Sequence, residues 1–359
     1  MSLENQGQKK ERKREIYLDI LRIVAIFLII IIHVSAQNWY VKQTNIFSFE
    51  WNIFNIYMSL SQSGTAIFVM ISGALFLSSN YSIEKIYKVK ILRIIIAFIF
   101  WALIYTLLFH KHSTLKDFIV NFSKGEYHLW FLYMIMGLYI LVPFFKKIVE
   151  NEFLMKYFLI LSFIFSIIII PLRKLVNIFK LDVLKTVLFK NILDKVDMHF
   201  VVGFSFYFIL GYFLHKTIID SKKSILIYFL GILGLISTII FSVLLSRYIG
   251  EQNQLFYNRF TPNMFFYILF IFVFFKNIFK DFKFTDKQKE IIVKMSQYSF
   301  GAYLVHVLIL KWLKQFFALN TLSFNPIFSV PVIAIIVFGV SFLISALLNK
   351  IPLLNKYIV

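Results

Sequence analysis

Apolar stretches of about 20 residues recur along this chain, and they limit its possible folds more than any other feature. The hydrocarbon core of a membrane is about 30 Å thick, which an α-helix of about 20 apolar residues can cross. Inside that core every backbone N–H and C=O needs a partner within the protein, which favours helices. The sequence therefore predicts an all-α integral membrane protein with about ten transmembrane helices.

Ten such stretches can be placed, with short polar loops between them. They cover about residues 16–36, 57–79, 89–109, 128–149, 154–171, 200–216, 224–246, 262–280, 297–317 and 327–349. A basic tail over 1–15 precedes them, and we expect it to be cytoplasmic. The first stretch follows this tail as the core of a leader peptide would, but it carries ionisable residues that a cleaved leader would not need. We interpret it as a retained helix, so that 16–359 form one membrane domain.

The basic residues of the chain predict its orientation. An even number of spans puts both termini on one face, and the segments on that face carry about 22 Lys and Arg, against about 14 on the other. Both termini are therefore expected in the cytoplasm. The net charge of +20 is explained by membrane lipids as partners, and no nucleic acid is expected. The absence of Cys excludes disulfides and cysteine-ligated metals.

One basic loop, over 172–199, weakens this asymmetry. It holds six Lys and Arg residues and contains an amphipathic stretch over 176–192. Two interpretations stay open. The stretch is either a helix on the membrane surface or the mouth of a pocket for an anionic acceptor.

The first predicted helix carries three ionisable residues, which are costly inside a bilayer and so indicate function. Arg22 and His33 are eleven positions apart, which places them on one helical face and about 16 Å apart along the axis. Asp19 lies one turn before Arg22, where we expect it to form an ion pair. An imidazole suits proton transfer near neutral pH. In the alternative interpretation, Arg22 only reaches the lipid headgroups and His33 only lies at an interface.

Four segments, in order, carry a resemblance to a known family. They are YLDILRIVAIFLIIIIHVS over 17–35, GTAIFVMISGALFL over 64–77, YHLWFLYMIMGLYILVPFF over 127–145 and YSFGAYLVH over 298–306. The first resembles the family's signature of Arg, ten residues, then His. Together they make the chain similar to the membrane acyltransferase-3 family, and in particular to its O-acetyltransferases of surface polysaccharides, such as the one that modifies enterobacterial common antigen.

The resemblance implies an O-acyltransferase, most simply an O-acetyltransferase, in a bacterial cell membrane. The donor would be cytoplasmic acyl-coenzyme A, typically acetyl-coenzyme A, and the acceptor a hydroxyl of a surface or lipid-linked glycan. No metal is implied. His33 would be the catalytic imidazole, and Arg22 would help to hold the donor. A tunnel from the cytoplasm past Arg22 to His33 is the structural feature to look for.

Further candidates lie on the other predicted spans. Arg93 enters the third predicted span, where it either contacts donor phosphates or anchors the helix at the cytoplasmic face. Ser72, with the Gly that follows it, is expected to let the second helix approach the first closely, more than to act in catalysis. His306 lies in the middle of a span and needs a partner, and Tyr303 on the same face is the expected site neighbour.

Several aromatic and histidine positions remain. Trp130 and His128 are expected at the outer membrane interface, where aromatic residues are common. The resemblance also makes a role at the site plausible for them. The other histidines are expected in loops or at helix ends and are given no role: His110, His112, His199 and His215.

Two other functions are compatible with a chain of this kind. One is an exporter or flippase for polysaccharide or lipid-linked sugar without acyl transfer, since transporters also carry intramembrane charges. The other is a membrane-embedded sensor. The sparse Gly and Pro and the absence of a visible repeat argue against the exporter.

Overall fold

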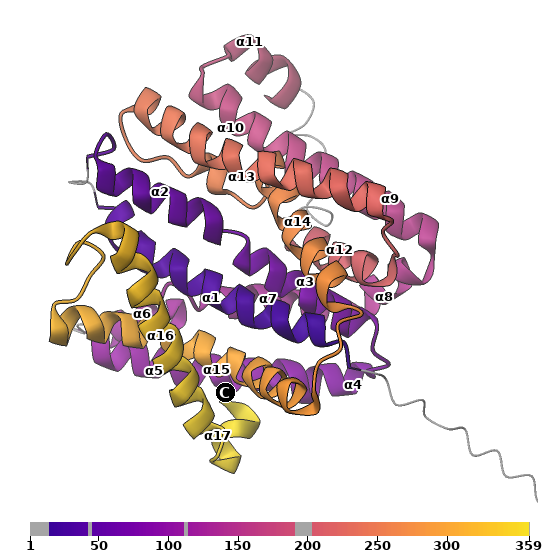
Figure 1. Ribbon diagram of the computed structural model, residues 1–359, viewed down its shortest axis with the longest axis vertical. Helices are drawn as coiled ribbons and strands as arrows, with labels where there is room; N and C mark the ends of the chain where they lie inside the picture. Colours follow the sequence, from indigo (N-terminus) through magenta and orange to yellow (C-terminus); the bar gives the residue numbers. More distant parts are fainter. Residues whose placement is uncertain (1–13, 42–44, 111–113, 191–202, 359) are drawn as a thin grey trace, which may run out of the picture.

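The computed structural model describes residues 14–41, 45–110, 114–190 and 203–358. These residues form helices and no strand, which confirms the all-α prediction (Figure 1). Residues 1–13 of the predicted tail lie outside the described part of the chain.

The helices follow one another with short connections. In the first half they are α1 (Ile16–Trp39), α2 (Phe49–Ser61), α3 (Gly64–Leu77), α4 (Ile83–Lys85), η1 (Ile86–Ile91), α5 (Leu92–Phe109), α6 (Leu115–Lys124), α7 (Trp130–Ile140), α8 (Val142–Glu150), α9 (Glu152–Ser162) and η2 (Phe163–Ile169). In the second half they are α10 (Ile170–Ile178), α11 (Asp182–Leu184), η3 (Lys185–Lys190), α12 (Phe204–Lys216), α13 (Ser221–Ile249), η5 (Leu255–Tyr257), α14 (Pro262–Phe279), α15 (Asp286–Phe317), α16 (Pro326–Leu348) and α17 (Pro352–Tyr357).

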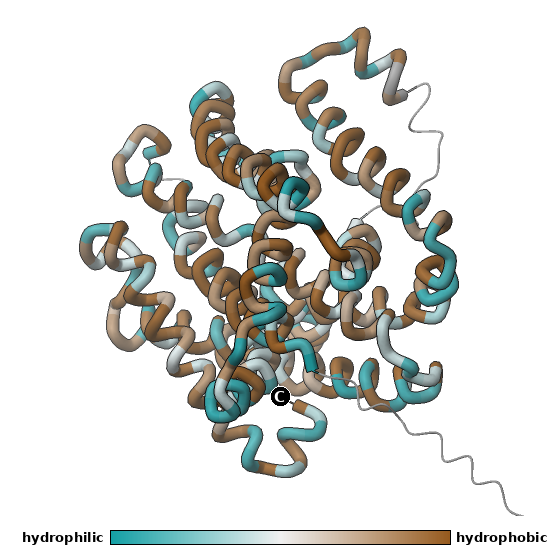
Figure 2. Tube along the Cα trace, turned by 45° about the vertical axis from the view of Figure 1, so that its right-hand side comes forward, coloured by the Kyte–Doolittle hydropathy of each residue, from teal (hydrophilic) through white to brown (hydrophobic). Residues whose placement is uncertain are grey.

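Helix α1 crosses the centre of the bundle and contacts α2, α3, α14, α15 and α16 (Figure 1). One face of α1 is buried against these helices, including Leu21, Ala25, Ile26 and Ile30. Hydrophobic residues run along the helices, and hydrophilic ones gather mostly at their ends and connections (Figure 2). An all-round apolar helix at the centre of a bundle is a good place for a polar site, because its few polar side chains are held by its neighbours.

The described helices support a multi-pass membrane protein. Seven helical stretches are long and apolar enough to cross a membrane: Ile16–Trp39, Phe49–Leu77, Ile83–Phe109, Glu152–Ile178, Ser221–Ile249, Leu255–Phe279 and Pro326–Leu348. An eighth is the pair α7 and α8, which is bent by 54°. Pro143 near the start of α8 cannot donate the backbone hydrogen bond that would continue α7. The single straight helix predicted over 128–149 is therefore broken.

Two of the ten predicted spans do not meet the length and hydropathy test for a membrane span. The one predicted over 200–216 appears as α12, which has 13 residues, and residues 200–202 lie outside the described part. The one predicted over 297–317 is the second half of α15, a 32-residue helix whose first turns are charged. The structure thus gives seven or eight spans by length and composition.

Close packing of α3 is the reason that glycine stands in its middle. A Cβ on Gly73 would lie 1.8 Å from the Phe208 carbonyl oxygen of α12. A Cβ on Gly211 of α12 would lie 2.1 Å from the Met70 carbonyl oxygen of α3. The segment with Ser72 was expected to approach the first helix, but the close approach is to α12, because glycines on both helices let their backbones meet. Contact with α1 is made instead at Gly64.

The basic segment after η2 forms α10, α11 and η3 at the edge of the bundle (Figure 1). Residues 191–199 of the predicted loop lie outside the described part. Val176 is buried, whereas Lys180 to Val187 are all exposed, apolar and basic residues alike, so the two interpretations of this segment stay open.

Candidate active site

Helices α1 and α15 run parallel. Both residues of the predicted pair, Arg22 and His33, lie on α1 and contact α15. The Arg22 Nη1 atom donates to the Ser296 hydroxyl at 3.4 Å. The ring centroids of His33 and His306 are 5.2 Å apart. Ser296 and His306 are ten positions apart on α15, and Arg22 and His33 are eleven positions apart on α1, so both residues of α1 face the same neighbour, as the spacing predicts. Arg22 and His33 are therefore at two levels about 16 Å apart along one helix.

The cavity at the Arg22 level is strongly basic. It has a volume of about 580 Å³, and its wall includes Arg22, Lys90 and Arg93 together with Ser72 and Tyr139. None of the described residues that line it is Asp or Glu. Three cations around one hollow without a carboxylate attract phosphate groups. Arg93, Arg22 and Ser72, which were predicted on three separate spans, are thus brought together.

Asp19 does not pair with Arg22 as expected. Its two carboxylate oxygens accept hydrogen bonds from Arg14 at 2.7 and 2.8 Å. This carboxylate raises the pKa of Arg14, chiefly through the side-chain hydrogen bond. The pairing differs because Arg22 points to α15, whereas Arg14 at the start of α1 folds back over Asp19. Asp19 therefore positions the start of α1, and Arg22 stays available in the cavity.

A second cavity lies at the His33 level. Its volume is about 510 Å³, and His33, Tyr127, Trp130 and Arg259 are among its lining residues. The ring of Tyr127 lies 5.1 Å from that of His33 between centroids. Trp130 is 40% exposed and faces the Arg259 guanidinium at 5.6 Å. The predicted residue Trp130 thus lines the same hollow as His33.

His306 and His128 are buried beside His33. The His128 and His306 ring centroids are 5.0 Å apart, and neither side chain is exposed by more than 1%. The Nδ1 of His306 lies 2.5 Å from the Tyr303 carbonyl oxygen, and the Nε2 of His128 lies 3.4 Å from the Leu304 carbonyl oxygen. Because a carbonyl only accepts, these nitrogens carry the protons, and each ring keeps a lone pair on its other nitrogen. Those two nitrogens are buried without a hydrogen-bond partner among the described residues.

Tyr303 has the expected place next to the site. Its hydroxyl donates to the His128 carbonyl oxygen. His128 itself was expected at an interface, but it is buried between α5 and α15, because the turn before α7 folds into the bundle.

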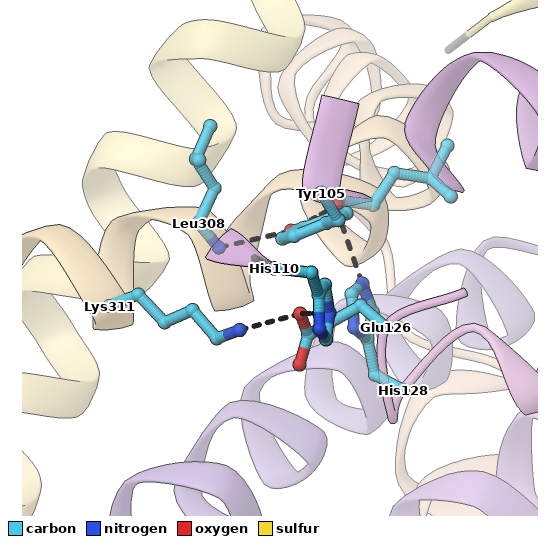
Figure 3. A network of polar contacts seen from close by, with 7 residues as sticks. Tyr105, His110, Glu126, His128, Leu308 and Lys311 are labelled. Carbon is cyan, nitrogen blue, oxygen red and sulfur yellow. Dashed lines mark hydrogen bonds and ion pairs between the residues drawn. The ribbon is translucent and has the colours of Figure 1, made fainter. Parts of the chain in front are cut away.

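A buried polar network holds this turn (Figure 3). Glu126, 5% exposed, accepts a hydrogen bond from the Lys311 ammonium at 2.5 Å, and His110 lies 3.7 Å from it. A buried carboxylate with a cation this close is strongly favoured over either charge alone. No role was predicted for Glu126, Lys311 or His110. The signal that could have pointed to Glu126 is an acidic residue two positions before the His-x-Trp motif.

Tyr105 connects the network to α15 (Figure 3). Its hydroxyl donates to the Leu304 carbonyl at 2.9 Å and accepts from the Leu308 N–H at 3.0 Å. These are the two backbone groups that an α-helix joins directly. Tyr105 therefore fixes the turn of α15 that carries His306. His112 and His199 lie outside the described residues, and His215 bonds Tyr17 at 2.6 Å, away from this site.

The two cavities share no lining residue among those that the structure describes. Phe68 and Phe131 line the Arg22 side, and Thr65 and Trp130, close by in α3 and α7, line the His33 side. The Phe68 and Phe131 rings meet edge to face at 6.1 Å. Two cavities with an aromatic layer between them thus stand where a continuous tunnel was looked for.

The three histidines do not form a metal centre. Within the described ranges, no group of three His, Asp or Glu side chains is arranged to hold a metal ion. The arrangement suits proton transfer by imidazole in a hollow that also admits a polar substrate.

Comparison with known proteins gives one match. A family model described as an acyltransferase domain matches residues 15–349, which include both cavities. No curated protein and no solved structure matches the chain.

Proposed function

The chain belongs to the acyltransferase-3 family, and from this premise we propose that it is an O-acyltransferase that moves an acetyl or related acyl group from cytoplasmic acyl-coenzyme A to a glycan hydroxyl. The acceptor is a surface glycan or its lipid-linked precursor, and the enzyme works in a bacterial cell membrane, as the O-acetyltransferases of surface polysaccharides do. The observation that carries the proposal is that Arg22 and His33 lie on one face of α1, each in the wall of its own cavity.

The basic cavity is the proposed donor site. Coenzyme A carries several phosphate charges, and Arg22, Lys90 and Arg93 supply three cations around a hollow of about 580 Å³. Guanidinium groups match phosphate with paired hydrogen bonds, which favours Arg at two of the three positions. The slender pantetheine arm then spans the roughly 16 Å to His33, passing between Phe68 and Phe131 when these rings move apart.

His33 is the proposed general base. It takes the proton of the acceptor hydroxyl as that oxygen attacks the thioester carbonyl carbon. The new C–O bond forms, the C–S bond breaks, and the departing coenzyme A sulfur takes the proton from His33. His306 and His128 support this role as neutral rings whose tautomers are fixed by backbone carbonyls, so that no second imidazolium faces His33.

The proposed topology has ten spans with both termini in the cytoplasm. It counts α12, which packs backbone to backbone against α3, and the second half of α15, whose residues Gly301 to Leu310 are all buried. The ends of α1 then put the Arg22 cavity toward the cytoplasm, where acyl-coenzyme A is made, and the His33 cavity toward the outside.

Purified full-length protein in lipid nanodiscs, given labelled acetyl-coenzyme A and cell-envelope glycan, tests the proposal. We expect label in the glycan and a loss of about 10²- to 10⁴-fold in turnover for His33→Ala, the usual contribution of a general base. His215→Ala, a histidine away from both cavities, is the matched control and keeps wild-type activity. Undiminished turnover in His33→Ala would refute the mechanism. Translocation of unmodified glycan without use of acetyl-coenzyme A would identify an exporter instead.

A further inference from the structure

Arg259 is a cation that the proposed reaction leaves unused. It lies in the loop between η5 and α14, and its carbonyl accepts a hydrogen bond from the Tyr207 hydroxyl, which fixes the backbone. Its guanidinium lies against the rings of Trp130 at 5.6 Å and Phe204 at 5.5 Å. The aromatic faces hold the side chain in place.

Among the residues that the structure describes, no acidic partner balances this charge. Within the described ranges Arg259 makes no ion pair and no side-chain hydrogen bond, and its Nε is buried without a partner. Two lysines of the bundle, by contrast, have their charge satisfied by the protein. Lys276 donates to three backbone carbonyls at 2.5, 2.7 and 3.0 Å, and Lys311 pairs with Glu126. A cation that serves only the structure is normally paired in this way, so an unpaired one next to a catalytic hollow indicates a ligand.

Arg259 is also placed where a substrate would meet it. It lines the His33 cavity and a neighbouring cavity of about 580 Å³, and Gln62 and Gln254 are common to both. The second cavity is rich in amide side chains, with one further cation. These residues are Asn177, Asn253, Asn258 and Lys174. Amides hydrogen-bond well to sugar hydroxyls because each offers a donor and an acceptor. The two cavities thus join a sugar-binding lining to an anion-binding one.

We propose that the acceptor glycan carries an acidic group, a phosphate or a carboxylate, which Arg259 binds so that a nearby sugar hydroxyl faces His33. This inference rests on the acyltransferase function proposed above. The anion is not that of the donor, because the donor cations lie at the Arg22 level, about 16 Å along α1 from His33. Lys174 of α10 adds positive charge on the path from the surface, in keeping with a pocket mouth for an anionic acceptor.

Trp130 offers a direct reading of this site, since its ring faces Arg259. Full-length protein in nanodiscs is titrated with glucose 1-phosphate, methyl glucuronide, methyl glucoside and inorganic phosphate while tryptophan fluorescence is recorded. We expect saturable changes with at least one acidic sugar, at a concentration at least about tenfold lower than with methyl glucoside, since charge-assisted bonds are the stronger ones. The first two probes distinguish phosphate from carboxylate.

Variants check that Arg259 is responsible. Arg259→Gln is expected to bind acidic and neutral sugars alike, and Arg259→Lys to keep part of the preference. Arg247→Gln is the matched control, because Arg247 lies over Phe47 outside both cavities and should keep the full preference. Equal binding of acidic and neutral sugars by the wild type would overturn the inference without relying on any variant. Inorganic phosphate that binds as tightly as the sugar phosphate would also overturn it, because the sugar would then contribute nothing.

Turnover of acetyl-coenzyme A separates this inference from the function on which it rests. Turnover that depends on His33, with no preference for acidic sugars, leaves the acyltransferase proposal standing and refutes the role of Arg259. An acid preference that depends on Arg259, without turnover of acetyl-coenzyme A, supports the anion site and refutes the proposed reaction.

Discussion

Single side chains at the two levels of α1 divide the work of the proposed reaction between binding and chemistry. Arg22 lines the basic cavity and makes a long hydrogen bond to Ser296 of α15 at 3.4 Å. His33 lies 11 positions further on, next to His306. A change at either residue should therefore affect a different kinetic constant.

Arg22→Gln is expected to raise the KM for acyl-coenzyme A by about 10- to 100-fold, with a smaller effect on kcat. The physical reason is the loss of a charge-assisted bond to a donor phosphate, roughly 1.5–3 kcal/mol. Steady-state kinetics in nanodiscs at varied donor concentration measure it. Arg247→Gln serves as control for the loss of one positive charge. An unchanged KM for the donor in Arg22→Gln would remove Arg22 from the donor site.

For single residues, the sequence predicted which side chains share a face of the same helix. The shared face of Arg22 and His33, and of Tyr303 and His306, follows from helical periodicity and is seen in the structure. The partner of Asp19 could not be predicted, because Arg14 and Arg22 are both within reach along the chain. Lys311, which pairs with Glu126, and Phe204, whose ring lies against Arg259, belong to distant segments of the chain. Helical periodicity does not predict which segments meet.

Helices α3 and α12 meet backbone to backbone, and their packing depends on two glycines. Gly73→Ala is expected to lower the free energy of unfolding by about 1–3 kcal/mol, the usual effect of overpacking, because the new Cβ would meet the Phe208 backbone. Thermal unfolding in detergent, followed by tryptophan fluorescence, measures the change.

The control for this prediction is Gly137→Ala in α7. A Cβ there meets nothing within 4 Å, so the helix should be unchanged or stabilised by up to about 1 kcal/mol. Equal stability of the Gly73 and Gly137 variants would contradict the packing described here.

The elements also show where prediction from hydropathy stops. Most spans were predicted correctly because a long apolar stretch is recognisable from hydropathy alone. The break between α7 and α8 at Pro143, the short α12 and the charged first half of α15 depend on how helices pack in three dimensions. In a bundle, neighbours can bury a helix that is too short, or too polar over part of its length, to cross a membrane by itself.

The whole molecule can be tested for the orientation that the proposal needs. Because the chain contains no Cys, each single-cysteine variant reports one position without further changes. Ser221→Cys, at the start of α13, is expected to react with an impermeant maleimide only from the cytoplasmic side. Ser323→Cys, in the loop after α15, is expected to react only from outside. Labelling of both from the same side in right-side-out vesicles would contradict the ten-span topology.

The aromatic layer between the cavities can be tested at the same scale. Phe131→Ala is expected to raise the hydrolysis of acyl-coenzyme A in the absence of acceptor, roughly tenfold if the barrier to water entry falls by about 1.4 kcal/mol. Phe144→Ala, on an exposed ring of α8, is the control and should leave hydrolysis unchanged. Donor hydrolysis at the wild-type rate in Phe131→Ala would show that the layer does not exclude water.

The same layer bears on the energy supply of the cell. A membrane stores work as an ion gradient, and an enzyme whose two substrates arrive from opposite faces risks opening a conducting path between them. Phe68 and Phe131, whose rings meet at 6.1 Å, interrupt such a path between the two hollows. In the proposed topology the rings are therefore an electrical insulator, which lets each hollow open to its own side without discharging the membrane.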